Sequence, residues 1–281
     1  VTTKSAAELV PLLRAGAPLT MCIQNYVAMD ISANVLLAAG ASPAMVNAEE
    51  EADDFTKISS CVSINIGTAL TPGWVKMMML TADACQKYGK PWCLDPVGMG
   101  ATPHRNDVCV ELMKKKPTVV RGNASEIMAL AGACKVELPE GLNTAGGKGV
   151  DSTAGTEEAL PAAVALAKTF GSIVAISGAV DIITDGKKMV CISNGTKLLT
   201  AVTGAGCSLS CLCASYAATC PSDPLLATAA AFLHFTVAAD LAEAKSGPTS
   251  PGSLRMHLMD QLHSVSPADI EKNAKLKESA V

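Results

Sequence analysis

Three charged side chains follow strand-like runs in a chain that is poor in charge. Charged residues make up 17% of the 281 residues. Asp95 comes directly after the apolar run Trp92–Leu94, Arg121 comes directly after Thr118–Val120, and Glu126 follows shortly after. Ligands of open α/β sheets gather beyond the carboxyl ends of the strands. Asp95 alone could be a turn residue and Glu126 an ordinary acid of a first helical turn, but their coincidence at one edge predicts a shared binding site.

A glycine-containing turn adds an element suited to phosphoryl chemistry. The run Thr200-Ala-Val-Thr-Gly-Ala-Gly-Cys207 precedes a long stretch that is almost free of charge. Gly204 and Gly206 permit a tight turn, and the N–H groups at the start of a helix attract anions. The backbone of Gly204, Ala205, Gly206 and Cys207 is therefore predicted to form an anion hole for a transferring phosphoryl group. Small residues before a buried helix are common, so the turn alone does not identify an enzyme.

Other nucleotide-binding motifs are not matched. The runs Gly98-Met-Gly-Ala-Thr-Pro and Gly204-Ala-Gly-Cys-Ser-Leu each lack the third glycine of a dinucleotide fingerprint. Lys90, Lys148 and Lys187 lack the neighbours that a P-loop requires. The sequence therefore disfavours a dehydrogenase and a P-loop enzyme.

Strand-like and helix-like runs alternate along the chain and must position these residues. The expected strands are Leu19–Gln24, Val62–Gly67, Trp92–Pro96, Thr118–Arg121, Ile173–Ser177 and Met189–Ser193, with Asp181–Thr184 as a further hairpin arm. The expected helices are Tyr26–Ala39, Thr71–Tyr88, Ser125–Ala131 and Thr156–Phe170, each followed by a glycine that can end it. This alternation predicts a three-layer α/β/α sandwich with a mostly parallel central sheet.

The organisation of the rest of the chain is simple. There is no internal repeat or low-complexity linker, so residues 1–281 are interpreted as a single domain. The glycine-rich region Gly141–Gly155 is expected to be a mobile loop, and the charged segment from Ser266 is expected to be peripheral. Between Lys197 and Asp240 the only formally charged residue is Asp223. Glycines and prolines interrupt this stretch, so two helices buried against the sheet explain it better than a membrane span.

Bulk composition gives little support for nucleic-acid binding and favours the reducing compartment of the cytoplasm. The net charge is −4, and the short run Lys114–Lys116 is typical of a solvated helix end, so nucleic acid is not an expected partner. The 11 cysteines are scattered, and Cys207, Cys211 and Cys213 do not match zinc-site spacing. Buried free thiols in a reducing compartment are expected. No basic and apolar signal precedes the first helix-like run.

Seven segments, taken together, resemble the hydroxyethylthiazole kinase family of the ribokinase-like superfamily. They are Cys22-Ile-Gln-Asn-Tyr-Val, Gly40-Ala-Ser-Pro-Ala-Met45, Asn65-Ile-Gly-Thr, Asp95-Pro-Val-Gly, Pro117-Thr-Val-Val-Arg-Gly-Asn-Ala-Ser-Glu126, Lys148-Gly-Val-Asp-Ser152 and Val202-Thr-Gly-Ala-Gly-Cys207. They occur in the family's order and extend over most of the chain. The wider superfamily shares only the Asn-x-x-Glu element and the Gly-Ala-Gly turn. It usually has Asp after that turn, where this chain has Cys207.

The resemblance implies a function and a set of roles. The family uses ATP to phosphorylate the hydroxyl of 4-methyl-5-(2-hydroxyethyl)thiazole, giving the thiazole phosphate and ADP in thiamine biosynthesis or salvage. The implied roles are ATP contacts by Arg121, Asn123 and Ser177, thiazole contacts by Met45, Gly204 and Asn25, organisation of Mg²⁺ by Asp95 and Glu126, and general base catalysis at the position of Cys207. Members of the family are typically homotrimers with the thiazole pocket at a subunit boundary.

The role of Cys207 stays open at this point. A thiol at a helix N-terminus can have a lowered pKa, whereas nearby phosphate charge opposes its ionisation. Cys207 could therefore act as a base or only shape the pocket. Met45 could equally be a core filler, and the histidines His104, His234, His257 and His263 show no ligand spacing and are expected to be structural.

Two other functions remain as alternatives. Another ribokinase-like enzyme, such as a pyrimidine-alcohol kinase or an ATP-dependent dehydratase, would share Asn123-x-x-Glu126 and the Gly-Ala-Gly turn but not the segments around Asn25 and Met45. A catalytically silent binder of thiazole or nucleotide is the second alternative. The intact Asp95, Arg121 and Glu126 weigh against the silent binder.

Overall fold

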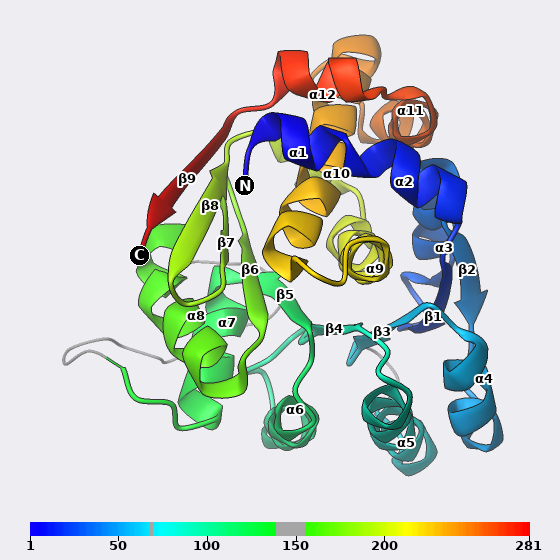
Figure 1. Ribbon diagram of the computed structural model, residues 1–281, viewed down its shortest axis with the longest axis vertical. Coiled ribbons are helices and arrows are strands. Elements are labelled where there is room, and N and C mark those ends of the chain that lie inside the picture. The colour runs from blue at the N-terminus through cyan, green and yellow to red at the C-terminus, as the bar shows by residue number, and fades with distance from the viewer. Residues whose placement is uncertain (68–69, 139–154) are drawn as a thin grey trace.

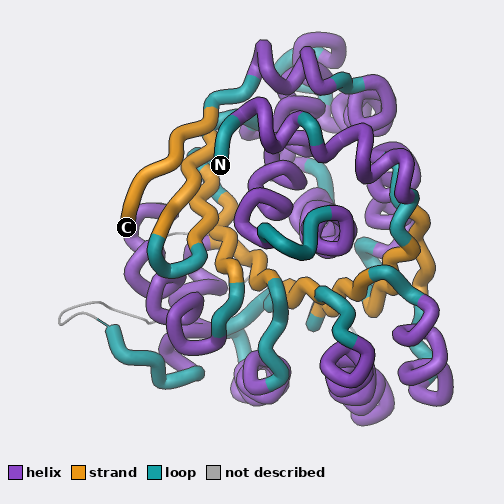
Figure 2. The backbone as a smooth tube through the Cα atoms, in the orientation of Figure 1, coloured by secondary structure: helices purple, strands orange, loops and turns teal. Residues whose placement is uncertain are grey.

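A central sheet of nine strands organises the molecule (Figures 1 and 2). The computed structural model describes residues 1–67, 70–138 and 155–281. The strand order is β2-β1-β3-β4-β5-β6-β7-β8-β9. The strands are β1 (Leu19–Ile23), β2 (Ser42–Met45), β3 (Cys61–Asn65), β4 (Trp92–Asp95), β5 (Val119–Asn123), β6 (Ile173–Ser177), β7 (Asp181–Thr184), β8 (Lys188–Ile192) and β9 (Leu276–Ala280). Pairings from β2 to β6 are parallel and those from β6 to β9 antiparallel, so the predicted mostly parallel sheet is confirmed.

Helices cover both faces of the sheet and confirm the predicted sandwich (Figure 1). One face carries α9 (Ala205–Thr219) and α10 (Pro224–Ser246), around which lie α1 (Thr3–Ala7), α2 (Leu9–Gly16), α3 (Met29–Ala39), α11 (Pro251–Ser264) and α12 (Pro267–Asn273). The other face carries α4 (Ala52–Ile58), α5 (Pro72–Tyr88), α6 (Pro103–Lys114), α7 (Ala124–Ala133) and α8 (Thr156–Phe170). Short 3-10 turns are η1 (Glu49–Glu51) and η2 (Lys197–Ala201). Each face has its own apolar core, so the sheet is buried on both sides.

Polar caps determine where helices begin after the strands. The hydroxyl of Thr71 accepts the N–H of Trp74 at 3.4 Å, and the hydroxyl of Thr102 accepts that of Arg105 at 3.3 Å. A proline follows each threonine in the first helical position, where its missing N–H costs nothing. These caps start α5 and α6 soon after the carboxyl ends of β3 and β4, which is the edge that carries the site.

Two edge strands were not among the predicted ones. β2 contains Pro43 and lies at one edge, where a proline is tolerated because one side of the strand lacks a partner. β9 lies at the other edge and has only half-buried and exposed residues, so the charged segment from Ser266 contains α12 and a strand of the sheet. Neither strand has the apolar run that marks a central strand.

Two predicted helix ends were also wrong. The helix expected at Tyr26 begins at Met29, because the Asn25 side-chain carbonyl accepts the N–H groups of Val27 and Ala28 at 3.0 Å each and holds a turn there. The helix expected to stop before Gly132 runs to Ala133. The chain leaves the helical direction only at Lys135, where φ is 53°.

The uncharged region beyond Lys197 forms buried helices, as predicted. α10 is long and apolar enough to cross a membrane, but 83% of its most apolar window is buried inside the protein. All 11 cysteines lie in the described residues and are free, so no disulfide framework exists there. The predicted loop Gly141–Gly155 lies outside the described residues except for Gly155, and the segment Lys148–Ser152 lies wholly outside them.

Candidate active site

The candidate site lies along the carboxyl ends of five neighbouring parallel strands. Parallel register places Asn65 of β3 beside Asp95 of β4, and Asn123 of β5 beside Ser177 of β6. Asn25 follows the end of β1. Residues from distant parts of the chain therefore meet at one sheet edge, as the sequence predicted for the charged members. Helix α9 packs against β1, β3, β4 and β5.

A buried polar network connects the strand ends. The Nδ2 group of Asn25 donates to Asn65 Oδ1 at 2.9 Å, and the Nδ2 group of Asn65 donates to Asp95 Oδ2 at 2.8 Å. The hydroxyl of Ser210 on α9 donates to the same Asp95 oxygen at 2.9 Å. The Asn25 amide also lies 3.6 Å from the sulfur of Cys207. The network therefore extends from the end of β1, across β3 and β4, to helix α9.

Asp95 retains one oxygen without a hydrogen-bond partner in the described part of the chain. Its side chain is 0% exposed, and among the described residues its Oδ1 atom has no hydrogen-bond partner. Burial raises the pKa of this carboxyl, while the charge of Arg121 and the bonds from Ser210 and Asn65 act in the opposite direction. An unpaired buried carboxylate oxygen is costly. The arrangement suits a cationic or hydrogen-bonding ligand at that oxygen.

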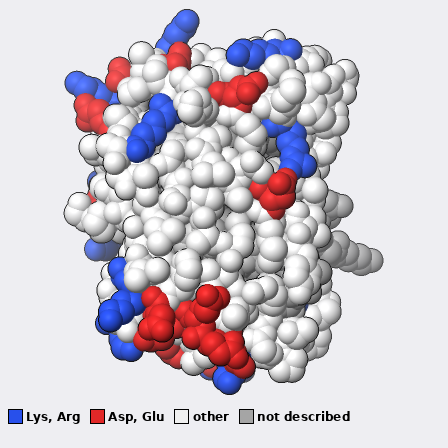
Figure 3. All heavy atoms as spheres, turned by 90° about the vertical axis from the view of Figure 1, so that its right-hand side faces the viewer, with Lys and Arg blue, Asp and Glu red and all other residues white. Residues whose placement is uncertain are grey.

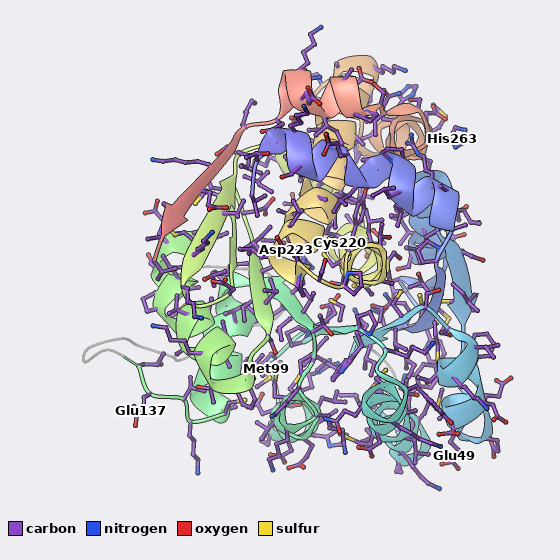
Figure 4. The ribbon with its side chains drawn as sticks, viewed as in Figure 1. Glu49, Met99, Glu137, Cys220, Asp223 and His263 are labelled. Carbon is purple, nitrogen blue, oxygen red and sulfur yellow. The ribbon has the colours of Figure 1, made fainter. Side chains whose placement is uncertain are left out.

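Glu126 has a structural role in addition to any ligand role. Its Oε2 atom accepts the N–H of Asn123 and its Oε1 atom accepts the N–H of Gly98, both at 2.9 Å. The Asn123 side chain accepts the N–H of Glu126 in return at 2.9 Å, which makes a capping box at the start of α7. Burial, with the charge of Asp95 next, raises the pKa of Glu126 to about 7. The carboxyl thus ties α7 to the loop after β4, where Met99 is buried (Figure 4).

Arg121 links the end of β5 to β6 and to the glycine turn. Its Nε–H donates to the hydroxyl of Ser177 at 2.9 Å. A Cβ atom on Gly206 would lie 2.5 Å from Arg121 Nη1, so the guanidinium packs directly against the turn. Two of the three residues predicted to contact ATP, Arg121 and Ser177, are in direct contact with each other. A guanidinium at this place can bind phosphate oxygens in pairs.

The turn that begins α9 is confined on its other side by α3. Gly204 has φ 78° and ψ 0°, and a Cβ atom there would lie 2.5 Å from Ile31 Cγ2. Only glycine fits both the conformation and the space. The N–H groups of Gly206 and Cys207 donate to no acceptor among the described residues, whereas the N–H of Ser208 closes the first helical bond at 2.9 Å. The predicted anion hole therefore has two N–H groups available at the start of a 15-residue helix.

Cys207 is a protonated thiol in this environment. Burial, followed by the charge of Asp95, raises its pKa to about 12, while Arg121 and the amides of Asn65 and Asn25 act to lower it. The helix N-terminus therefore does not make it a thiolate.

Met45 stands apart from the polar network. It ends the edge strand β2, pairs with Cys22 in parallel register and is half-buried. It packs against the same apolar core as Cys207. Its position is compatible with an apolar wall at one side of the site.

Two polar residues in this region carry no role predicted from the sequence. Asn65 was part of a quoted motif, and Asp181 lies inside a predicted strand. The Asp181 side chain accepts the N–H of Gly178 at 3.0 Å and so holds the turn that follows Ser177. Burial raises the pKa of Asp181 to about 7. A charged residue within an otherwise apolar strand was the available signal for Asp181.

The histidines have structural contacts, as predicted. His234 is buried and lies between the Tyr216 hydroxyl at 2.8 Å and the Leu262 carbonyl at 3.0 Å. His104 contacts the carbonyl of Leu70, and His257 contacts Asp260. His263 lies on α11, in its last turn (Figure 4). Among the described residues, no group of three or more His, Cys, Asp or Glu side chains could hold a metal ion by itself.

The fold and the site first indicate the class of protein to which this chain belongs. The structure of Staphylococcus aureus pyridoxal kinase superposes with a TM-score of 0.62 at 15% identity, covering 94% of this chain and 98% of that one. At this identity the likeness shows the fold alone, which is ribokinase-like. A family model described as the hydroxyethylthiazole kinase family matches residues 10–268. The chain therefore belongs to the hydroxyethylthiazole kinase family.

Individual relatives match along nearly the whole chain. The hydroxyethylthiazole kinase of Rhizobium rhizogenes is 46% identical over 274 residues, which are 98% of this chain and 97% of that protein. That of Gemmatimonas aurantiaca is 44% identical over 276 residues, 98% of this chain and 94% of that protein. The solved hydroxyethylthiazole kinase of Pyrococcus horikoshii OT3 has a TM-score of 0.87 at 36% identity, covering 98% of this chain and 99% of that one. These matches confirm the family that the sequence segments indicated.

Proposed function

We propose that this protein transfers the γ-phosphoryl group of ATP to the hydroxyl of 4-methyl-5-(2-hydroxyethyl)thiazole, giving the thiazole phosphate and ADP in thiamine biosynthesis or salvage. The observation that carries the proposal is the match to hydroxyethylthiazole kinases over 98% of the chain. The site supports it, because phosphoryl transfer needs mainly alignment and charge neutralisation. Both are available at this sheet edge.

The nucleotide is proposed to lie over β5 and β6. Arg121 and Ser177, joined at 2.9 Å, would contact its phosphates, and Asn123 lies beside Ser177 in the strand register. The Asn123 side chain also caps α7, so this residue joins the proposed nucleotide site to the start of that helix. The N–H groups of Gly206 and Cys207 would hold the oxygens of the transferring group as charge develops on them.

Magnesium is proposed to be held near Asp95 and Glu126. Mg²⁺ prefers oxygen ligands and usually keeps several waters, needing only one or two carboxylates beside the substrate phosphates. Asp95 fits this description, because its Oδ1 atom is buried and unpartnered among the described residues. Glu126 fits less directly, since both of its oxygens accept backbone N–H groups. When bound, the ion would neutralise charge on the β- and γ-phosphates.

The acceptor alcohol is proposed to lie between the apolar wall and the glycine turn. Met45, Gly204 and Asn25 would contact the thiazole, and the hydroxyl would approach Cys207. Cys207 enters the reaction as a thiol, because its pKa is raised to about 12. A role as proton acceptor therefore requires that it lose its proton within the complex.

The test is ATP consumption against a panel of vitamin-precursor alcohols. ADP release is followed with hydroxyethylthiazole, with the pyrimidine alcohol of thiamine synthesis, with pyridoxal and with no acceptor. Rapid ADP release with hydroxyethylthiazole alone is expected. Preference for the pyrimidine alcohol would instead support the related kinase, and no turnover with any acceptor, together with measurable ATP binding, would support a silent binder.

We also propose a homotrimer whose thiazole pocket lies at a subunit boundary. Tyr26 and Val27, which follow Asn25, are 61% and 58% exposed, an unusual state for large apolar side chains next to a site. Figure 3 shows the side of the molecule that carries β2, α3 and α4. Its middle is broadly uncharged, and charged side chains gather above and below. Such a surface supports burial against another copy.

Two further points complete the proposal. The single sheet and its two apolar cores support the treatment of residues 1–281 as one domain. The 11 free cysteines support action in a reducing compartment, which we propose is the cytoplasm.

A further inference from the structure

We propose that Asn65 is a positioning residue of the reaction, and this inference rests on the proposed function. Asn65 is 1% exposed and lies at the end of β3, between Asn25, which is proposed to contact thiazole, and Asp95, which is proposed to help hold Mg²⁺. Its Oδ1 atom faces Asn25, and its Nδ2 group faces Asp95. It bonds to Asn25, whose amide also reaches the Cys207 sulfur, and it bonds directly to Asp95. It therefore aligns the acceptor half of the site with the phosphate half.

The orientation of both amides is determined by backbone donors. The N–H of Gly67 donates to Asn65 Oδ1 at 2.9 Å. A backbone N–H can only donate, so the Nδ2 group of Asn65 must face Asp95. In the same way, the N–H groups of Val27 and Ala28 donate to Asn25 Oδ1 at 3.0 Å each, so the Nδ2 group of Asn25 must face Asn65.

The donor and acceptor of every hydrogen bond in this series follow from these two orientations. The Asn25 amide donates both to Asn65 Oδ1 at 2.9 Å and towards the sulfur of Cys207 at 3.6 Å. The Cys207 sulfur therefore accepts from Asn25, and its own proton must point elsewhere. Asn65 completes this series of hydrogen bonds by donating to Asp95 Oδ2 at 2.8 Å. Asn65 therefore bonds directly to both Asn25 and Asp95.

Packing leaves little freedom for a substitute arrangement. A Cβ atom on Gly67 would lie 2.5 Å from the Asn25 Cβ and 2.7 Å from its Nδ2 atom. The backbone at Gly67 thus packs closely against the Asn25 side chain, and its N–H also orients Asn65. Loss of the Asn65 amide removes the partner on which this placement depends, and leaves the buried Asp95 with one donor fewer.

The experiment compares Asn65→Ala with Ser63→Ala as a matched control. Ser63 lies two positions earlier on β3, on the same side of the strand and fully buried, and its hydroxyl has no hydrogen-bond partner among the described residues. We expect Asn65→Ala to lower kcat by roughly 10- to 100-fold, as for loss of a hydrogen bond to a charged group. The KM for ATP should change little, because Arg121 and Ser177 are untouched. Ser63→Ala should keep the parental kcat.

A double variant tests whether Asn65 acts through Asn25. If it does, Asn25→Ala combined with Asn65→Ala loses no more turnover than the worse of the two single variants, because neighbours of one network are not additive. Multiplied losses would show two independent roles and overturn the inference. Parental kcat in a folded Asn65→Ala variant would overturn it as well.

A second variant covers the case in which Asn65→Ala does not fold. Gly67→Ala keeps every polar side chain but displaces Asn25, so it should lower kcat while leaving the KM for ATP unchanged. Thermal unfolding verifies the fold of each variant. A folded Gly67→Ala variant with parental kcat would overturn the alignment role. Failure of the proposed function is seen separately, because the parental protein would then release no ADP with hydroxyethylthiazole.

Discussion

Replacement of Cys207 by alanine separates a chemical role of the thiol from a packing role. Burial and the charge of Asp95 raise the pKa of Cys207 to about 12. At pH 7 the thiolate would then be about 10⁻⁵ of the molecules, since each pH unit below the pKa lowers its fraction about tenfold. If this rare form accepts the proton of the alcohol, Cys207→Ala should lower kcat by roughly 10²–10⁴-fold, the usual range for loss of a general base. The KM for the alcohol should change less, because alanine leaves the backbone N–H groups in place.

The pH dependence of kcat provides an independent test of the proposed base role of Cys207. A base whose pKa lies above the assay range gains its active form as the pH rises, so log kcat should increase with a slope near one from about pH 6 to 9. Cys207→Asp should retain or raise turnover at neutral pH, because a carboxyl has an ordinary pKa of about 3.9 and is ionised much earlier than this thiol. Its profile should also be flatter.

The assay is steady-state ADP release at saturating ATP and Mg²⁺, with Cys220→Ala as the control. Cys220 follows the far end of α9 and is partly exposed, so its loss removes a thiol without touching the site. Cys207→Ala at the parental rate, with an unchanged pH profile, would refute the base role. The proton would then leave through phosphate or water, and Cys207 would be a packing residue.

Three further predictions concern metal, nucleotide and assembly. Glu126→Gln should fold but need more Mg²⁺ for half activation. Because the pKa of Glu126 is about 7, Mg²⁺ activation of the parental enzyme should weaken as the pH falls below 7. This pH dependence should be smaller in the Glu126→Gln variant. If the variant and the parental enzyme need the same Mg²⁺ concentration at every pH, Glu126 does not belong to the metal site. Gly206→Ala should raise the KM for ATP roughly tenfold by displacing Arg121, as loss of one charged hydrogen bond would, whereas Gly73→Ala, whose added methyl meets nothing within 4 Å, should not. Activity should fall on dilution as the trimer dissociates in sedimentation, and a fully active monomer would contradict the shared pocket.

The central strands and the charged site residues could be predicted because each left a clear local signal. Strands buried on both faces are continuous apolar runs, as β3 and β4 are. Asp95, Arg121 and Glu126 were detectable because charge is rare in this chain and each follows such a run. Parallel strands present their carboxyl ends at one edge, so sequence position was sufficient to place these residues together.

The rest could not be predicted because it depends on contacts between distant segments. The edge strands β2 and β9 are half solvated and lack an apolar run, so only their pairing partners define them. The role of Asn65 depends on strand register, which places it beside Asp95. The raised pKa of Cys207 depends on burial by the sheet, which opposes the effect expected from a helix N-terminus alone.

The glycine turn at the start of α9 lies between the two halves of the site and is confined from both sides. Gly204 meets Ile31 of α3 on the side proposed for the acceptor, and Gly206 meets the Arg121 guanidinium on the side proposed for the nucleotide. A side chain at either position would have to displace one of these neighbours, so the two glycines let the alcohol half and the ATP half approach the same backbone N–H groups. A phosphoryl group that moves from one half to the other would pass over these N–H groups. The same segment can therefore stabilise the charge during transfer without moving itself, which is the preorganisation that electrostatic catalysis requires.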